Sequence, residues 1–207
     1  MSAQVWRLET AGNQDPNGPP VHANNVWLIG DDAFVILIDP AHDCAAVAAA
    51  VGDRQVAEIL LTHGHWDHIR AAVAVGQRFG VIPRLHPADA FLWEAEHGSA
   101  PFLPLADGQR FFVAGLTLEA RHTPGHTPGS TSLVASDLAT VFTGDTLFQG
   151  GPGATRWDYS SFDTIITSIR ERLLTLPPEF TVNTGHGPST SIAREAPQLP
   201  AWVARGW

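Results

Sequence analysis

The sequence predicts a mixed α/β fold in which two β-sheets pack together and helices cover them from outside. Predicted strands come in pairs and hairpins broken by helices, which is neither strict strand–helix alternation nor an all-β pattern. Many strands are apolar along their whole length, which favours burial of both faces. The chain has 207 residues, of which 44% are hydrophobic and 16% charged. We therefore expect one domain over residues 1–207 with a substantial core.

The first half of the chain reads as strands separated by loops and helices. The expected elements, in order, are a loop over 12–20, strands over 25–30 and 33–39, a helix capped by Asp43 and running to about Val51, a buried strand over 56–62, a helix over 68–80, a short strand over 81–86, and a helix opened by Pro87 and running to about His97. Gly80 is expected to end the helix over 68–80, because glycine readily adopts the left-handed conformation found after helices.

The second half of the chain contains two predicted hairpins and the clearest amphipathic helix. The expected elements are a hairpin over 109–123 that turns at Ala114 and Gly115, a hairpin over 131–145 that turns near Asp137, a helix over 160–176 capped by Ser160 or Ser161, a strand over 180–186, and a short C-terminal helix over 191–204. Pro177 and Pro178 are expected to stop the long helix, since proline cannot continue it.

Charge and composition exclude several classes of protein. There are 12 basic and 21 acidic residues, giving a net charge of −9, and no basic cluster, so nucleic acid is not an expected partner. The N-terminus lacks a signal-peptide pattern, and no apolar run approaches the ~20 residues of a membrane helix. Cys44 is the single cysteine, which excludes an intramolecular disulfide. A cytoplasmic enzyme, monomeric or homodimeric and without a membrane partner, is expected.

The segment LTHGHWDH (61–68) concentrates metal ligands after a predicted strand. It contains His63, His65, Asp67 and His68. In an extended segment, residues two apart point the same way, so the first three can converge on one side. Four ligands are too many for one catalytic zinc, which takes three protein groups and keeps one position open. The pattern therefore favours two ions, each completed from elsewhere in the chain.

Three further candidates lie just after predicted strands and beside glycines. They are His126 in RHTPGHTPGS (121–130), Asp145 in TGDTLF (143–148) and His186 in NTGHGPS (183–189). Loops of this kind can gather at one sheet edge. The other histidines, His22, His42, His86, His97 and His122, lack such spacing and are expected mainly at the surface or behind the ligands.

The segments THGHWDHIRAA, HTPGHTPGS, TGDTLFQGG and TGHGPS, in this order, resemble the ligand motifs of the metallo-β-lactamase-fold hydrolases, and most of all the glyoxalase II (hydroxyacylglutathione hydrolase) branch. The resemblance covers about residues 25–188. It implies a four-layer αββα sandwich of two mixed sheets with a dinuclear site at one edge. Two divalent metal ions, zinc in the first place with iron or manganese as alternatives, would be held there.

The same resemblance implies a role for each ligand. His63, His65 and His126 would hold one ion, Asp67, His68 and His186 the other, and Asp145 would bridge them. Asp67 and Asp145 are also the candidate catalytic residues, with Asp67 a ligand first and at most a secondary proton acceptor. Asp39, at the end of a predicted strand, would support the ligand loop without binding metal.

The implied reaction is hydrolysis of a small-molecule thioester by a water that the two ions activate. The leading substrate is a 2-hydroxyacyl thioester such as S-lactoylglutathione or the ester of another low-molecular-weight thiol. Lactone or other ester hydrolysis, persulfide oxidation at a single iron and metal binding without catalysis are the alternatives.

Three departures from the glyoxalase II pattern bear on the branch. No C-terminal helical domain is expected after His186. The loop over 150–160, GGPGATRWDYS, replaces the usual thiol-binding element, and its Arg156, Trp157 and Tyr159 are candidate substrate contacts. Arg70 and Ala71 stand where two glycines are usual.

Overall fold

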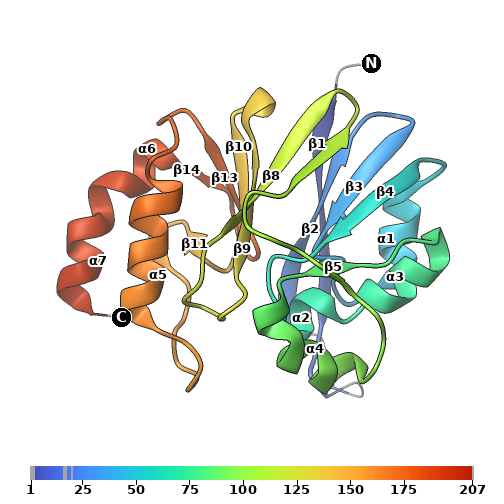
Figure 1. Ribbon diagram of the computed structural model, residues 1–207, viewed down its shortest axis with the longest axis horizontal. Coiled ribbons are helices and arrows are strands. Elements are labelled where there is room, and N and C mark those ends of the chain that lie inside the picture. Colours follow the sequence, from blue (N-terminus) through green and yellow to red (C-terminus); the bar gives the residue numbers. More distant parts are fainter. Residues whose placement is uncertain (1–2, 16–17, 20, 207) are drawn as a thin grey trace.

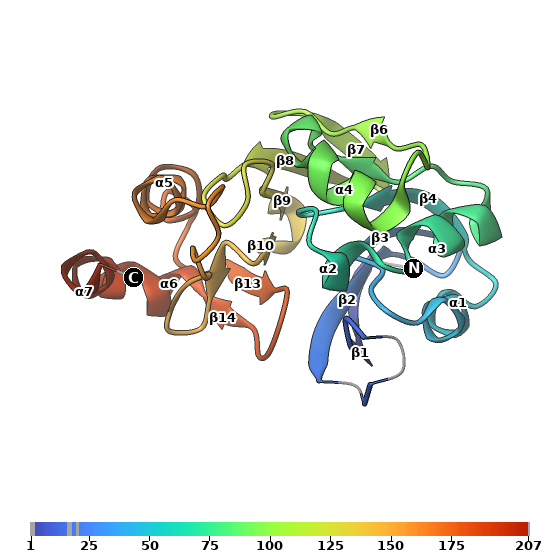
Figure 2. The same ribbon diagram turned by 90° about the horizontal axis from the view of Figure 1, so that it is seen from below.

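The computed structural model describes residues 3–15, 18–19 and 21–206. Two six-stranded sheets pack against each other, and helices cover the outer face of each (Figure 1). Figure 2 shows the two helical layers on opposite sides of the paired sheets. The predicted four-layer αββα sandwich is confirmed.

The first sheet is built from the N-terminal half in the order β1-β2-β3-β4-β5-β6. Its strands are β1 (Gln4–Gly12), β2 (His22–Gly30), β3 (Phe34–Ile38), β4 (Gln55–Leu60), β5 (Arg84–Leu85) and β6 (Leu103–Pro104). β1, β2 and β3 pair antiparallel, whereas β3 to β6 pair parallel, so the sheet is mixed. The helical segments beside it are α1 (Cys44–Val51), α2 (Trp66–Ile69), α3 (Ala72–Phe79), η1 (Pro87–Asp89) and α4 (Ala90–His97).

The second sheet has the order β14-β13-β10-β9-β8-β7. Its strands are β7 (Arg110–Val113), β8 (Leu116–His122), β9 (Thr131–Ala135), β10 (Thr140–Gly144), β13 (Thr181–Thr184) and β14 (Thr190–Ser191), and β11 (Leu147–Phe148) pairs separately with β12 (Gly151–Pro152). β10 and β13 pair parallel and the other neighbours antiparallel. The remaining helical segments are η2 (Ser136–Leu138), α5 (Phe162–Ser168), the π-helical η3 (Ile169–Leu173), α6 (Ile192–Glu195), η4 (Ala196–Gln198) and α7 (Leu199–Arg205).

Side chains that alternate along the strands fill the layers. In β3, Ile36 and Ile38 lie in the core between the sheets, where Phe142 of β10 is also buried. Val35 and Leu37 point the other way, into the core under the helices of the first sheet. Both faces of β3 are therefore buried, as its continuous apolar sequence predicts. A third core packs α5 and α7 against the second sheet.

Most predicted elements are present, with shifted ends. Asp43 caps α1 through the backbone N–H groups of Ala45 and Ala46, and Ser161 caps α5, as expected. The two predicted hairpins over 109–123 and 131–145 form. Residues 16, 17 and 20 of the predicted loop over 12–20 lie outside the described part of the chain.

Three expectations about elements are wrong, and one strand was missed. The helix over 68–80 is divided into α2 and α3 by a turn at Arg70 and Ala71, where the Arg70 side chain contacts Trp66 and Glu96. The strand over 81–86 shrinks to two residues after Pro83, which has no N–H to donate. The helix over 160–176 is α-helical only to Ser168 and then continues as η3. No strand was predicted at β1, although it pairs with β2 over its whole length.

Within the described residues, no helix combines the length and the apolar character needed to cross a bilayer.

Candidate metal centre

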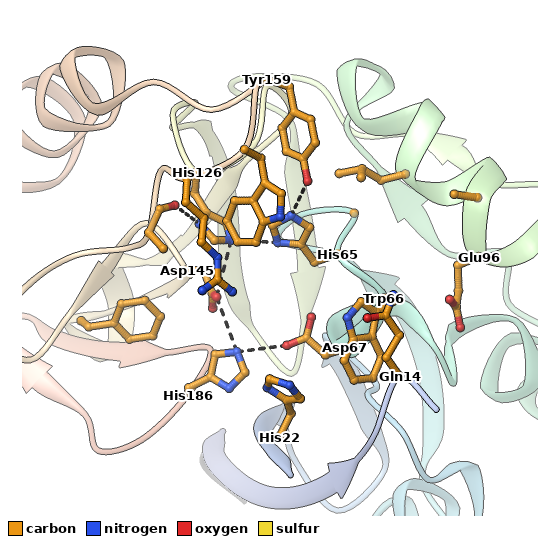
Figure 3. Close-up of a pocket in the computed structure, with 17 residues that line it drawn as sticks. Gln14, His22, His65, Trp66, Asp67, Glu96, His126, Asp145, Tyr159 and His186 are labelled. Atoms are coloured by element: carbon orange, nitrogen blue, oxygen red, sulfur yellow. Dashed lines mark hydrogen bonds and ion pairs between the residues drawn. The ribbon is translucent and has the colours of Figure 1, made fainter. Parts of the chain in front are cut away.

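Three histidines from two loops form the first group of ligand atoms. His63 and His65 follow β4, and His126 lies between β8 and β9. His63 Nε2 is 3.2 Å from His65 Nδ1, which is 2.9 Å from His126 Nε2. All three rings are nearly fully buried. The facing nitrogens therefore surround one point, as Figure 3 shows for His65 and His126.

Asp67, His68 and His186 form the second group. His68 Nε2 and His186 Nε2 are 3.2 Å apart, and His186 Nε2 is 3.3 Å from Asp67 Oδ2. Asp67 and His68 belong to α2, whereas His186 follows β13. The pairing of β10 with β13 brings the ends of these strands, and hence Asp145 and His186, to the same edge.

Asp145 lies between the two groups (Figure 3). Its Oδ1 is 3.3 Å from His68 Nε2, and its Oδ2 is 3.6 Å from His126 Nε2 and 3.5 Å from His186 Nε2. Oδ1 is buried and has no hydrogen-bond partner within the described residues. A Cβ on Gly185 would lie 2.2 Å from Oδ1, so glycine is required at this position. The structure thus brings all seven predicted ligands together.

Each histidine has a second partner on its other ring nitrogen. In the first group, His63 Nδ1 lies 3.1 Å from Thr62 Oγ1, His65 Nε2 lies 3.0 Å from Tyr159 Oη, and His126 Nδ1 lies 2.7 Å from the Ala154 carbonyl oxygen. In the second group, His68 Nδ1 lies 3.0 Å from Asp39 Oδ2, and His186 Nδ1 lies 2.7 Å from the Ala23 carbonyl oxygen. Such outer partners fix ring orientation and leave the facing nitrogen free to ligate.

Asp39 lies where the sequence predicts a supporting carboxylate. Its Oδ1 accepts a hydrogen bond from the Thr62 backbone N–H at 2.7 Å, and its Oδ2 accepts from the Thr62 hydroxyl at 2.6 Å as well as contacting His68. Asp39 is 1% exposed and has a φ of 49°. It also belongs to a possible ligand trio with His63 and His68, but its oxygens are already engaged in these hydrogen bonds.

Burial keeps the first group neutral. It lowers the pKa of His65 to about 3 and also lowers the pKa of His63 and of His126, because a charged ring loses hydration there. A neutral imidazole is the form that binds a metal ion. The protonation state of this group at pH 7 therefore already suits ligation.

The second group carries paired opposite charges. Burial alone would lower the pKa of His186, but Asp145 and Asp67 together raise it to about 10. Burial is likewise overcome at His68, where Asp145 and Asp67 raise the pKa well above its ordinary value. The pKa of Asp67 is raised by burial but lowered more by its cationic neighbours, His68 foremost. The protons on these rings occupy positions that a divalent cation would take over.

The donor set and its spacing fit divalent metal ions. Two ligands about 2.0–2.1 Å from a tetrahedral zinc ion lie roughly 3.3 Å apart. The facing nitrogens of the first group are 2.9 and 3.2 Å apart, and those of the second group 3.2 Å. Imidazole and carboxylate ligands suit zinc, iron and manganese. Asp145 Oδ1, which accepts no hydrogen bond from the described residues, lies 3.3 Å from His68 Nε2 and adds a further ligand atom to this space.

A cavity of about 570 Å³ opens over the two groups. Its lining includes the predicted contacts Arg156, Trp157 and Tyr159. The Trp157 ring lies 4.5 Å from the His65 ring, and the Arg156 guanidinium lies 4.9 Å over Trp157. The Tyr159 hydroxyl is engaged by His65, so it orients a ligand in addition to bordering the cavity.

Arg70, where glycine is usual, supports the opposite wall of the cavity. Its guanidinium lies 4.5 Å over the ring of Trp66 and pairs with Glu96 at 2.9 Å. Trp66, Glu96 and Gln14 line the cavity on this side (Figure 3). The arginine stands in the turn between α2 and α3, where its side chain reaches this wall.

Two buried residues near the ligands were not found in the sequence. Asn24 donates to Asp67 Oδ2 at 3.1 Å and accepts from His42 at 2.7 Å. Asp89 is fully buried and contacts the loops that carry the first group. Neither residue has a motif of its own, because both act on segments far away in the sequence. His22, expected at the surface or behind the ligands, is exposed and borders the cavity.

Comparisons with known proteins agree with this geometry. A sequence profile of the metallo-beta-lactamase superfamily matches residues 19–186. The chain is 36% identical over 211 residues to "Probable metallo-hydrolase YqgX" of Bacillus subtilis, covering 94% of this chain and 96% of that protein. It is 36% identical over 193 residues to "Hydroxyacylglutathione hydrolase GloC" of Haemophilus influenzae, covering 85% of this chain and 91% of that protein.

The solved structure of TTHA1623 in a di-iron-bound form is similar with a TM-score of 0.78 and 29% identity, covering 91% of this chain and 96% of that chain. The predicted superfamily is thereby confirmed, and the glyoxalase II branch stays a prediction. Fold, ligand cluster and sequence likeness lead to one conclusion: the chain belongs to the metallo-beta-lactamase superfamily.

Proposed function

We propose that this metallo-hydrolase cleaves acyl thioesters, and that its preferred substrate is a 2-hydroxyacyl thioester of a low-molecular-weight thiol, such as S-lactoylglutathione. The observation that carries the proposal is the position of Asp145, a carboxylate within 3.6 Å of ligand atoms from both groups. The likeness to a protein named as a hydroxyacylglutathione hydrolase supports the choice of a thioester.

Two bound divalent cations, zinc in the first place with iron or manganese as alternatives, would supply a water of lowered pKa and a Lewis acid for the substrate carbonyl. The chain holds the site ready for them. The neutral rings of His63, His65 and His126 point inward, and Asp145 offers an oxygen toward each group. Asn24 restrains the carboxylate of Asp67, which serves as a ligand first and at most as a secondary proton acceptor.

The loop over 150–160 forms the substrate wall beside the first group. Trp157 covers the rings of His65 and His126 and limits the access of bulk water to them. Arg156 provides a cation in the cavity with no described carboxylate within ion-pair distance, which suits a substrate that carries a carboxylate. Tyr159 orients His65 by hydrogen bonding.

The test is elemental analysis of the purified protein beside hydrolysis assays on a 2-hydroxyacyl thioester, a lactone and a β-lactam. Two metal ions per chain with thioester turnover are expected. Turnover of the lactone alone would replace the thioester with an ester substrate. One iron per chain with oxygen consumption on a persulfide would overturn hydrolysis, and two metals without turnover of any substrate would indicate a non-catalytic protein.

Variants test the assignment of the ligands. His63→Ala or Asp145→Ala is expected to remove activity and lower bound metal while the chain stays folded, because each loses a donor to the site. Asp137→Ala is the matched control: Asp137 accepts a hydrogen bond from the Thr117 N–H beside the turn between β9 and β10 and does not line the cavity. Full activity in a metal-depleted preparation of either ligand variant would refute the mechanism.

A further inference from the structure

The side chain of Asp89 does not cap the helix that it precedes. It precedes α4 in the N-cap position, where an aspartate usually accepts hydrogen bonds from the first turn. Its side chain makes no such bond. Asp89 is instead fully buried. A carboxylate taken out of water needs several donors to offset its lost hydration, so its actual partners indicate what it does.

All three partners of Asp89 belong to the loops that carry the first group. Oδ2 accepts from the Gly64 N–H at 2.8 Å and from the Thr127 hydroxyl at 2.7 Å, and Oδ1 accepts from the Gly129 N–H at 2.6 Å. Gly64 lies between His63 and His65 in sequence, and Thr127 follows His126. One carboxylate thus connects the segment after β4 with the loop between β8 and β9.

The packing around this carboxylate leaves no room for a side chain at Gly129 or Gly64. A Cβ on Gly129 would lie 2.6 Å from Asp89 Cγ, and a Cβ on Gly64 would lie 3.0 Å from Asp89 Cβ and 2.8 Å from Leu92 Cβ. Real Cβ atoms do not approach so closely. The two glycines let both loops close on Asp89, and a longer glutamate side chain would push them apart.

We propose that Asp89 is a positioning residue that holds the two loops at the separation that lets His63, His65 and His126 face a single metal ion. The inference rests on the proposed metal site and adds to it a residue that touches no ligand side chain. Outer partners of metal ligands commonly contribute 10–100-fold to metal affinity. Asp89 acts through the backbone of the ligand loops, so its loss is expected to weaken the first group alone.

The decisive variant is Asp89→Asn. An amide has only one acceptor oxygen, so the NH2 group of the asparagine must take the place of Oδ1 or of Oδ2. In the first orientation it faces the Gly129 N–H, and in the second it faces both the Gly64 N–H and the Thr127 hydroxyl. At least one hydrogen bond is lost in either orientation. Metal-free protein is titrated with Zn²⁺ against a chromophoric chelator, which yields two binding constants. His126→Ala and His186→Ala identify which constant belongs to which group.

Asp89→Asn is expected to lower the first-group constant by about 10–100-fold and to leave the second within about twofold. Asp31→Asn is the matched control, because Asp31 also accepts two backbone N–H groups, in the turn between β2 and β3. Thr127→Val, which removes one donor, is expected to weaken the same constant less, and Thr127→Ser to preserve it. If Asp89→Asn does not fold, the two Thr127 variants carry the test.

Non-additivity of Asp89→Asn and Thr127→Val in the double variant would support a shared contact. Unchanged constants, or equal losses at both groups, would overturn the role of Asp89. Absence of metal binding in the unmodified chain would overturn the proposed function, and this result is distinct from metal binding that is insensitive to Asp89.

Discussion

Replacing Asp39 by asparagine removes a buried negative charge without changing the size of the side chain. Asp39 accepts from the Thr62 N–H through Oδ1 and from the Thr62 hydroxyl through Oδ2, and Oδ2 also lies 3.0 Å from His68 Nδ1. Because an ionised carboxylate only accepts, His68 Nδ1 carries a proton and Nε2 is the nitrogen available to a metal. The asparagine NH2 group would face His68 Nδ1, which would then have to accept a hydrogen bond and could not carry the proton.

The proton of a neutral His68 would then lie on Nε2, which could not ligate. In the opposite amide orientation the NH2 group would face the Thr62 N–H, so two hydrogen-bond donors would meet and that bond would be lost. Loss of such an outer partner typically weakens metal binding 10–100-fold, which corresponds to about 1.4–2.7 kcal/mol. Chelator competition is expected to show this loss in the second group. Asp43→Asn, which alters only the cap of α1, is the control. Equal second-group affinities in the Asp39 variant and the unmodified chain would refute the tautomer reasoning.

Further predictions concern pH, specificity and packing. The pKa of His186 is raised from 6.5 to about 10 in the metal-free chain, so its protonation stabilises the fold fully below pH 6.5 and this contribution is lost as pH rises through about 10. Second-group Zn²⁺ affinity should rise with pH over this range, about tenfold per unit for each displaced proton, and pH-independent affinity in calorimetry would contradict this. Arg156→Gln should raise KM by up to about fivefold for a carboxylate-bearing thioester, because an exposed ion pair contributes at most about 1 kcal/mol, and should leave KM for a neutral thioester unchanged. Equal effects on both substrates would exclude a charge role. Phe142→Ala should cost about 3–5 kcal/mol in denaturant unfolding, because Phe142 is 0% exposed, whereas Phe112→Ala, at 72% exposure, should change stability by under about 0.5 kcal/mol. Equal losses would contradict the predicted core.

The ends of elements show where sequence patterns stop being informative. Asp43 and Ser161 cap their helices as predicted, because a cap acts on N–H groups two or three residues away. The break after Ile69 was not predicted, because apolar and alanine-rich residues continue through it. At this break Arg70 contacts Trp66 and Glu96, and Glu96 lies on a different helix, α4.

The sequence by itself determined which residues could hold metal. His63, His65, Asp67 and His68 are close in the chain, and His126, Asp145 and His186 each follow a predicted strand, so residue type and local position suffice to identify them. The tertiary structure decided how those residues are supported. Asp89 reaches Gly129 across 40 residues, and Tyr159 reaches His65 across 94. Such contacts arise from the packing of two sheets and their loops, which no local pattern encodes, because the direction of a side chain depends on the elements that surround it.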